Sequence, residues 1–158
     1  MTPAASITVG PIAAADTWPL RKLVLRPHQR GDAVVLGGDD DPRAVHVGAR
    51  DADGEVVGIA TVSPQPCPWD PAREGAWRLR GMATAEGRRG QGIGELVLAE
   101  VLRRVRAAGG TLVWCNARTG ALTFYERAGF TPGAEPYVDP ELGPHVPMQL
   151  DLGGDRSG

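Results

Sequence analysis

The stretch RRGQGIGELVLAE, residues 88–100, places three glycines at alternate positions directly before an apolar helical pattern. Glycine loses more backbone freedom on folding than any other residue, so three of them here indicate a backbone shape that the chain needs. The first N–H groups of a helix have no partner within it, and the helix dipole adds positive charge at that end. Glycines also let a phosphate approach the backbone closely. On spacing alone, the stretch fits an anion-binding loop and a tight packing turn equally well.

Two common nucleotide-binding patterns do not fit these residues. The dinucleotide pattern G-x-G-x-x-G needs a third glycine where the sequence has Glu95 or Val97, counting from Gly90 or Gly92. The P-loop pattern needs a lysine after its last glycine, and the stretch has none. A phosphate ligand of this loop therefore belongs to another class.

Outward from the loop, strand and helix patterns alternate along the chain. Apolar alternation predicts strands at 6–10, 44–50, 55–63, 76–84, 111–116, 131–138 and 145–150. Helices are predicted from an Asp16 N-cap to about Leu25, from Ile93 to a stop at Gly109, and over 120–129. The segments 28–43 and 64–75 are predicted loops, and DADG at 51–54 indicates a hairpin.

Composition sets the class of protein. The chain has 158 residues, 42% of them apolar and 23% charged, which predicts one globular domain, here over 6–152, with frayed ends at 1–5 and 153–158. The net charge of −2 gives no basic field for nucleic acid or an anionic membrane. Cys67 and Cys115 form no CxxC motif, and neither a signal peptide nor a membrane span is evident. We therefore expect a cytoplasmic protein with reduced thiols and no metal site.

Two blocks of the sequence resemble the GNAT-type N-acetyltransferase superfamily. The superfamily's acyl-CoA loop has the pattern R/Q-x-x-G-x-G/A, which Arg89 to Gly94 match in full. LRGMAT at 79–84 is similar to the strand before that loop, and NARTGALTFYERAGF at 116–130 is similar to the second block. The resemblance implies an α/β (α+β) GNAT fold with a twisted, mixed and mostly antiparallel sheet. About six to seven strands and three to four helices are implied, with a splay between the strands at 78–84 and 111–116.

The same resemblance implies how acetyl-CoA binds. Acyl-CoA would lie between the splayed strands, pairing its pantetheine arm with the backbone of 82–84 and its pyrophosphate with the amides of 90–94. Arg88 would add charge, or form a solvated rim. The implied cofactor-binding residues are Met82, Ala83, Thr84, Arg89, Gly90, Gln91, Gly92, Ile93, Gly94 and Asn116. Asn116 is predicted to end its strand, where the alternative is a turn-capping role.

Acetyl transfer to an amine needs a neutral amine and a proton for the departing thiolate. An amine with a pKa of about 10.4 is neutral in about one molecule in 2,500 at pH 7, so a base or a desolvated pocket must assist. By the resemblance Tyr125 is the catalytic acid. The alternative is core packing, because Tyr125 lies on an apolar helix face with Ala121, Phe124 and Ala128.

The base is open in the sequence. Many members of the superfamily carry a glutamate where this chain has Arg78, which puts a direct glutamate base in doubt. The alternatives are a water chain, His28, His46, His145 and Glu74. Arg78 and Arg80 would share a strand face and either receive a substrate carboxylate or pair with surface acids.

Two further features have open roles. The acidic run 39–41 would attract an amine substrate or form a solvated loop, and Trp69 would wall the acceptor pocket or only pack. The expected function is acetyl-CoA-dependent transfer to a small-molecule primary amine, by direct attack in a ternary complex. A protein N-acetyltransferase and a non-catalytic acyl-CoA-binding sensor are the alternatives. No nucleic-acid or membrane partner is expected, and a homodimer is left open.

Overall fold

The computed structural model describes residues 6–25, 36 and 38–153 of the chain. The chain divides into two compact units, which we call unit 1 (Met1–Ser63 and Arg80–Arg104) and unit 2 (Pro64–Leu79 and Val105–Gly158), and only their described residues are considered below. Strand β4 (Ala76–Thr84) contributes residues to both units. The predicted frayed ends at 1–5 and 153–158 lie outside the described residues except for Gly153, and the single domain over 6–152 stays a prediction.

Unit 1 is built on antiparallel strands in the order β1, β2, β3, β4. The strands are β1 (Thr8–Pro11), β2 (Val45–Arg50), β3 (Val56–Pro64) and the later residues of β4. The predicted hairpin joins β2 to β3, and the Asp51 carboxylate accepts the N–H groups of Asp53 and Glu55 there. Gly54 has a φ of 83°, the left-handed value that favours glycine in this turn.

The first helical segment differs from its prediction. It begins with a 3₁₀ turn (Ala14–Thr17), passes through α1 (Trp18–Leu20) and ends in a π turn (Arg21–Leu25). The prediction of Asp16 as the N-cap was wrong, because Ala13 is the N-cap. The Ala13 N–H donates to the Asp16 carboxylate at 3.2 Å. The predicted boundary at 28 lies outside the described residues.

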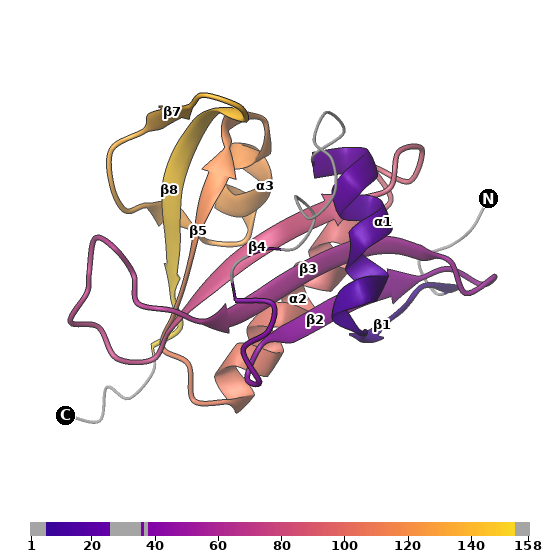
Figure 1. The fold of residues 1–158 in the computed structure, drawn as a ribbon, viewed down its shortest axis with the longest axis horizontal. Coiled ribbons are helices and arrows are strands. Elements are labelled where there is room, and N and C mark those ends of the chain that lie inside the picture. The colour runs from indigo at the N-terminus through magenta and orange to yellow at the C-terminus, as the bar shows by residue number, and fades with distance from the viewer. Residues whose placement is uncertain (1–5, 26–35, 37, 154–158) are drawn as a thin grey trace. The chain divides into compact units, whose positions relative to one another are not determined.

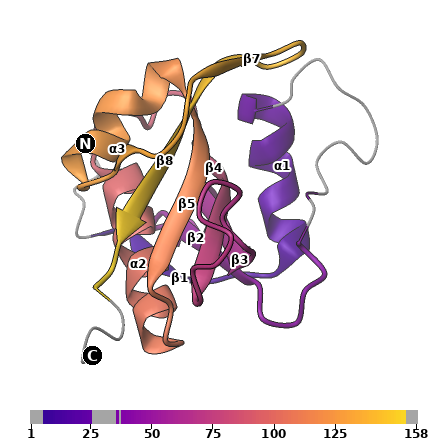
Figure 2. The ribbon, with the colours of Figure 1, turned by 90° about the vertical axis from the view of Figure 1, so that its left-hand side faces the viewer.

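Helix α2 (Ile93–Ala107) begins directly after the glycine loop, as predicted. Its positions at spacing four, namely Ile93, Val97, Val101 and Val105, are no more than 1% exposed. In unit 1, α1 and α2 lie on opposite faces of the strands (Figures 1 and 2). Strand β3 is therefore buried on both faces along most of its length.

Unit 2 pairs the start of β4 in parallel with β5 (Leu112–Arg118), which pairs in turn with the antiparallel β8 (Gly143–Asp151). The predicted strand at 131–138 forms two short strands instead, β6 (Thr131–Pro132) and β7 (Tyr137–Asp139), each paired with β8. A 3₁₀ turn (Thr119–Ala121) leads into α3 (Leu122–Arg127), which covers one face of β5 and β8 (Figure 2).

The fold class is confirmed as mixed α/β with a mostly antiparallel sheet, which has eight strands in the part of the chain that the structure describes. The ladder between β4 and β5 has three pairs, from Ala76↔Leu112 to Arg78↔Trp114, and the splay of these strands stays a prediction. Of the helices that the structure describes, none combines the length and hydropathy that a bilayer-spanning segment needs.

Candidate active site

The glycine loop in unit 1 has the backbone shape that the sequence predicts. Gly90 and Gly92 have φ values of 82° and 77°, a region that residues with side chains rarely adopt. A β-carbon placed on either residue would meet no atom within 4 Å. The glycines are therefore required by the backbone angle and not by crowding from the protein, and the space beside them is open.

The amides of this loop and of the first helical turn have no protein acceptor. The first bond of α2 runs from the Leu96 N–H to the Gly92 carbonyl at 3.1 Å. Among the described residues, the N–H groups of Gly90 through Glu95 donate to no carbonyl or side chain. A helix start with this many unpaired N–H groups, in open space, can hold a phosphate group.

Arg88 braces the loop and is not a solvated rim. Its guanidinium donates to the Asp51 carboxylate at 3.2 Å and to the Gln91 side-chain oxygen at 3.1 Å. Arg88 thus ties the loop to the β2–β3 turn, while Arg89 is exposed. Gln91, predicted as cofactor-binding, contributes its side chain to this brace.

The last residues of β4 are those predicted to pair with the pantetheine arm. Met82, Ala83 and Thr84 follow Gly81, whose φ of 64° interrupts the regular strand. They lie beyond the three-pair ladder with β5. Ala83 is buried, whereas Met82 and Thr84 are partly exposed, so backbone recognition suits this segment better than side-chain recognition.

Tyr125 is a buried residue of α3 in unit 2. It is 6% exposed and packs edge-on against Phe124 and Phe130, with ring centroids 5.1 and 5.3 Å away. Burial, with a smaller effect of Cys115, raises the pKa of Tyr125, so its phenol keeps its proton at neutral pH. Burial likewise raises the pKa of the Cys115 thiol to about 12. Packing and a proton-donating role are thus compatible at this residue.

Asn116 does not end its strand. Strand β5 continues to Arg118, and Asn116 is paired with Pro147 of β8. The turn-capping alternative is therefore wrong, because the backbone of Asn116 belongs to a ladder. Its half-buried side chain makes no hydrogen bond to the described residues and is available to a ligand. Alternation places Asn116 on the face of β5 opposite to Cys115, the residue that interacts with Tyr125.

The base candidates have different surroundings. His145 of β8 is buried, and its Nδ1 lies 2.8 Å from the Gly143 carbonyl oxygen. A carbonyl only accepts, so Nδ1 carries the proton and Nε2 of the neutral ring keeps a lone pair. The Nδ1 of His46 is instead bonded to Thr61 at 2.8 Å. Glu74 is exposed in the turn before β4, and His28 lies outside the described residues.

Asp39 is not part of a solvated acidic loop. It forms a two-pronged pair with the guanidinium of Arg21 at 2.6 and 3.0 Å, and the two side chains are 6% and 1% exposed. Arg21 also donates to Thr61 at 2.8 Å. Burial alone would raise the pKa of Asp39, but the bonds from Arg21 and the Leu36 N–H outweigh it and lower the pKa. Asp41 pairs with Arg43 at the surface.

This buried network was missed at the level of sequence. The sequence signals were indirect, namely an arginine on a helix of otherwise apolar spacing and an aspartate run in a loop. In the structure, Arg21 begins the π turn and pairs with Asp39. Arg21 also donates to Thr61 of β3, which is in turn hydrogen-bonded to His46 of β2.

Arg78 and Trp69 share an aromatic cluster in unit 2. The Arg78 guanidinium carbon lies 4.9 Å from the ring centroid of Trp114, its register partner on β5. Trp69 packs edge-on against Trp114 at 5.4 Å, and its Nε1 donates to Gln149 at 2.6 Å. Pairing of Arg78 with surface acids is therefore wrong for the described residues, since no carboxylate among them contacts it. Arg80 belongs to unit 1.

The predicted site residues fall into two groups. The glycine loop and Met82–Thr84 belong to unit 1, whereas Asn116 and Tyr125 belong to unit 2. The roles of both groups stay predictions.

Comparison with known proteins gives consistent results. The model of the acetyltransferase (GNAT) family matches residues 14–130. The uncharacterised N-acetyltransferase YitI of Bacillus subtilis (strain 168) is 34% identical over 150 residues, covering 95% of this chain and 99% of YitI.

Solved structures match the fold over nearly the whole chain. Escherichia coli ElaA gives a TM-score of 0.74 at 18% identity, covering 92% of this chain and 99% of ElaA. An aminoglycoside 6'-N-acetyltransferase complexed with coenzyme A gives 0.71 at 16% identity, covering 91% and 96%.

Proposed function

The chain belongs to the acetyltransferase (GNAT) family and is an acyltransferase, and on that premise we propose that it transfers the acetyl group of acetyl-CoA to a primary amine of a small molecule. The observation that carries the proposal is the open row of unpaired N–H groups from Gly90 through Glu95. A pyrophosphate supplies the acceptors that these donors lack. The related aminoglycoside enzyme, which is complexed with coenzyme A, supports this choice of ligand.

The remaining cofactor contacts follow the proposed orientation. The backbone of Met82–Thr84 would pair with the pantetheine arm as a further strand would. Asn116 offers an amide side chain that the described protein leaves unbonded. Acetyl-CoA and free thiols at Cys67 and Cys115 both suit a cytoplasmic enzyme, which is the location we propose.

The proposed chemistry is direct attack in a ternary complex. The amine nitrogen attacks the thioester carbonyl carbon, a C–N bond forms, and the C–S bond breaks. The proton that leaves the amine goes to a base, for which His145 offers the lone pair of Nε2. Tyr125 gives its phenol proton to the CoA thiolate.

The free-energy cost of proton transfer from Tyr125 to the CoA thiolate depends on how deeply both groups are buried. In water, a phenol with a pKa of about 10 donates to a thiolate whose acid has a pKa of about 8.5, at a cost of about 2 kcal/mol. Burial raises the pKa of Tyr125 and would make donation harder by itself. The same kind of surroundings raises the pKa of a thiol, as at Cys115, so a buried CoA thiolate is a stronger base and the two effects offset each other.

A thiol-release screen tests the proposal. Purified protein is incubated with acetyl-CoA and a panel of polyamines, amino acids, aminoglycosides and peptides, and free CoA is measured. We expect turnover with at least one class of small amine. Turnover with peptides only would favour a protein N-acetyltransferase, and binding of acetyl-CoA without any turnover would favour a sensor.

A thermal-shift control separates binding from chemistry. Acetyl-CoA should raise the melting temperature, because a ligand that binds only the folded state stabilises it by RT ln(1 + [L]/Kd). NAD and ATP should raise it much less. An equal rise in melting temperature with acetyl-CoA, NAD and ATP would show that the glycine loop is not specific for acyl-CoA.

A further inference from the structure

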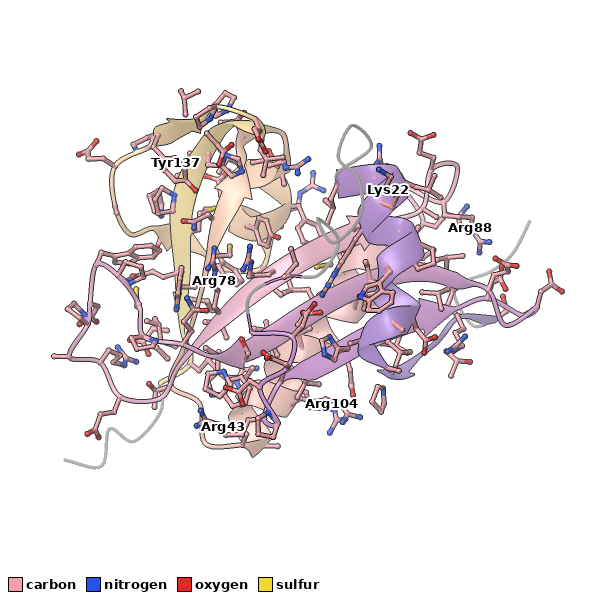
Figure 3. All side chains as sticks on the ribbon, viewed as in Figure 1. Lys22, Arg43, Arg78, Arg88, Arg104 and Tyr137 are labelled. Carbon is pink, nitrogen blue, oxygen red and sulfur yellow. The ribbon has the colours of Figure 1, made fainter. Side chains whose placement is uncertain are left out.

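Arg78 differs from the other arginines in the described part of unit 2. It is partly buried, it packs against an aromatic ring, and it contacts no acidic side chain there. Arg78 (labelled in Figure 3) is half-buried, its guanidinium lies over the Trp114 ring, and its Nε is fully buried without an acceptor among the described residues. It donates no hydrogen bond and forms no ion pair within the described residues. Burial lowers the pKa of Arg78, which expresses the cost of keeping this charge away from water.

Arg73, in the same unit, shows the usual arrangement. Its guanidinium pairs with the Asp151 carboxylate at 3.1 Å and donates to the Thr111 carbonyl at 2.8 Å. A buried charge without such a partner is destabilising unless something outside the chain completes it. The protein therefore keeps at Arg78 a charged donor set that a bound anion would satisfy.

The surroundings of Arg78 restrict its orientation. Trp114 is held by a hydrogen bond from its Nε1 to the Gln65 carbonyl at 2.9 Å and by the edge of Trp69. The contact with this ring, 4.9 Å from the guanidinium carbon to the ring centroid, restricts the guanidinium before a ligand arrives. The guanidinium fork matches a planar carboxylate through two parallel hydrogen bonds.

Among the described residues, no carboxylate interacts with Arg78. The groups that interact electrostatically with Arg78 are Tyr137 (Figure 3) and Cys115. Burial raises the pKa of both, so both are neutral at physiological pH. Tyr137 is also stacked on His145, with ring centroids 5.4 Å apart, which places the candidate base in the same neighbourhood.

From these observations we propose that Arg78 binds a carboxylate of the amine acceptor, so that the preferred substrates are amines that also carry a carboxylate group. This inference rests on the proposed acetyl transfer and names its substrate class. An isolated cation at this place disfavours simple diamines, because like charges repel, and it favours amino acids and similar zwitterions.

Matched acceptor pairs test this inference. The thiol-release assay compares amino acids with their carboxamides, for example L-lysine with L-lysinamide and β-alanine with β-alaninamide, at saturating acetyl-CoA. Amidation removes the carboxylate and lowers the pKa of a neighbouring amine, which increases its neutral fraction. A preference for the free acid therefore cannot arise from amine reactivity. We expect kcat/KM to be about 10- to 100-fold higher for the best acid than for its amide, mainly through KM.

Three variants identify the residue responsible. Arg78→Met keeps an apolar side chain over Trp114 and should bring the acid-to-amide ratio to about one. Arg78→Lys keeps the charge without the fork and should retain part of the preference. Arg106→Met is the control, because Arg106 is an exposed residue of α2, and it should keep the wild-type ratio.

The outcomes separate the inference from the proposed function. Stabilisation by acetyl-CoA should be the same in wild type and Arg78→Met. If acetyl-CoA stabilises the protein but the ratio is near one in wild type, or unchanged in Arg78→Met, the carboxylate site is wrong and the acetyl transfer stands. The carboxylate site is also contradicted if no carboxylate-bearing amine is turned over. It is contradicted as well if the preference for phosphoethanolamine over ethanolamine exceeds the preference for the free acids over their amides. If acetyl-CoA neither binds nor reacts, the proposed function itself fails.

Discussion

Replacing Gly92 by valine should damage acetyl-CoA binding far more than folding. Gly92 has a φ of 77°, and a β-carbon there meets no atom within 4 Å, so the cost of folding is mainly the backbone angle. A left-handed residue with a side chain costs about 1–2 kcal/mol, or slightly more for a β-branched one. For a chain of this size, each kcal/mol lowers the melting temperature by about 2–4 °C.

The effect on the ligand is larger because the valine side chain enters the open space beside unpaired amides. Loss of one amide-to-phosphate bond costs about 1.5–3 kcal/mol, which weakens binding about 10- to 150-fold. Gly109→Val is the matched control, since Gly109 has a φ of 85° and is equally uncrowded, but lies after the other end of α2.

Calorimetric titration with acetyl-CoA and a melting curve measure the two effects in the same preparations. Both variants should lose similar stability, and only Gly92→Val should lose affinity. Equal acetyl-CoA affinity in the two folded variants would refute the assignment of this loop to the pyrophosphate.

Three other predictions follow from buried groups. Tyr125→Phe keeps the ring that packs on Phe124 and Phe130, so stability and the Kd for acetyl-CoA should hold while the chemical step slows by about 10²–10⁴-fold; an unchanged rate under chemistry-limited conditions would return Tyr125 to packing alone. Asp39→Asn removes the carboxylate that pairs with the buried Arg21 guanidinium and should cost about 3–5 kcal/mol in urea unfolding, whereas Asp41→Asn, which removes a surface pair with Arg43, should change the free energy of unfolding far less. Because the folded pKa of Asp39 is lowered, its contribution is complete above the unfolded pKa of about 3.9 and is lost as the pH falls through the folded value. The gap between wild type and Asp39→Asn should therefore narrow in acid, and a gap independent of pH would contradict the buried pair. Cys67 and Cys115, both buried with raised pKa values, should resist alkylation at pH 8 until denaturant is added, and native labelling at the unfolded rate would show that they are accessible.

Most helices and strands could be predicted from local sequence patterns. The spacing of Ile93, Val97 and Val101 identified α2 because a helix buries one face at that period, and the structure buries all three. The loop before it was predictable because only glycine adopts the angles found at Gly90 and Gly92 without strain.

Tertiary pairing decided what the sequence could not show. Asn116 looked like a strand end, but β8 extends the ladder through Arg118 and keeps Asn116 within it. The pairing of Arg21 with Asp39 joins residues 18 positions apart and depends on a π turn that no local pattern indicates. Propensity is weaker than such contacts.

The candidate site divides in the same way. The resemblance was enough to select Tyr125 and the glycine loop, whose local geometry suits their proposed roles. The role of Arg78 stayed open in the sequence because its partner depends on the register of β4 against β5. That register puts Trp114, an aromatic ring, beside Arg78, and no acid among the described residues pairs with the guanidinium.

The central claim is that this chain moves the acetyl group of acetyl-CoA onto an amine. The most direct measurement uses acetyl-CoA labelled with ¹³C in the acetyl group and follows the label by mass spectrometry, with free CoA counted in the same samples. We predict a labelled amide in an amount equal to the CoA released, and loss of both signals when the amine is omitted. Release of labelled acetate without an amide, or bound acetyl-CoA that persists unchanged with every amine and peptide tested, would contradict the account.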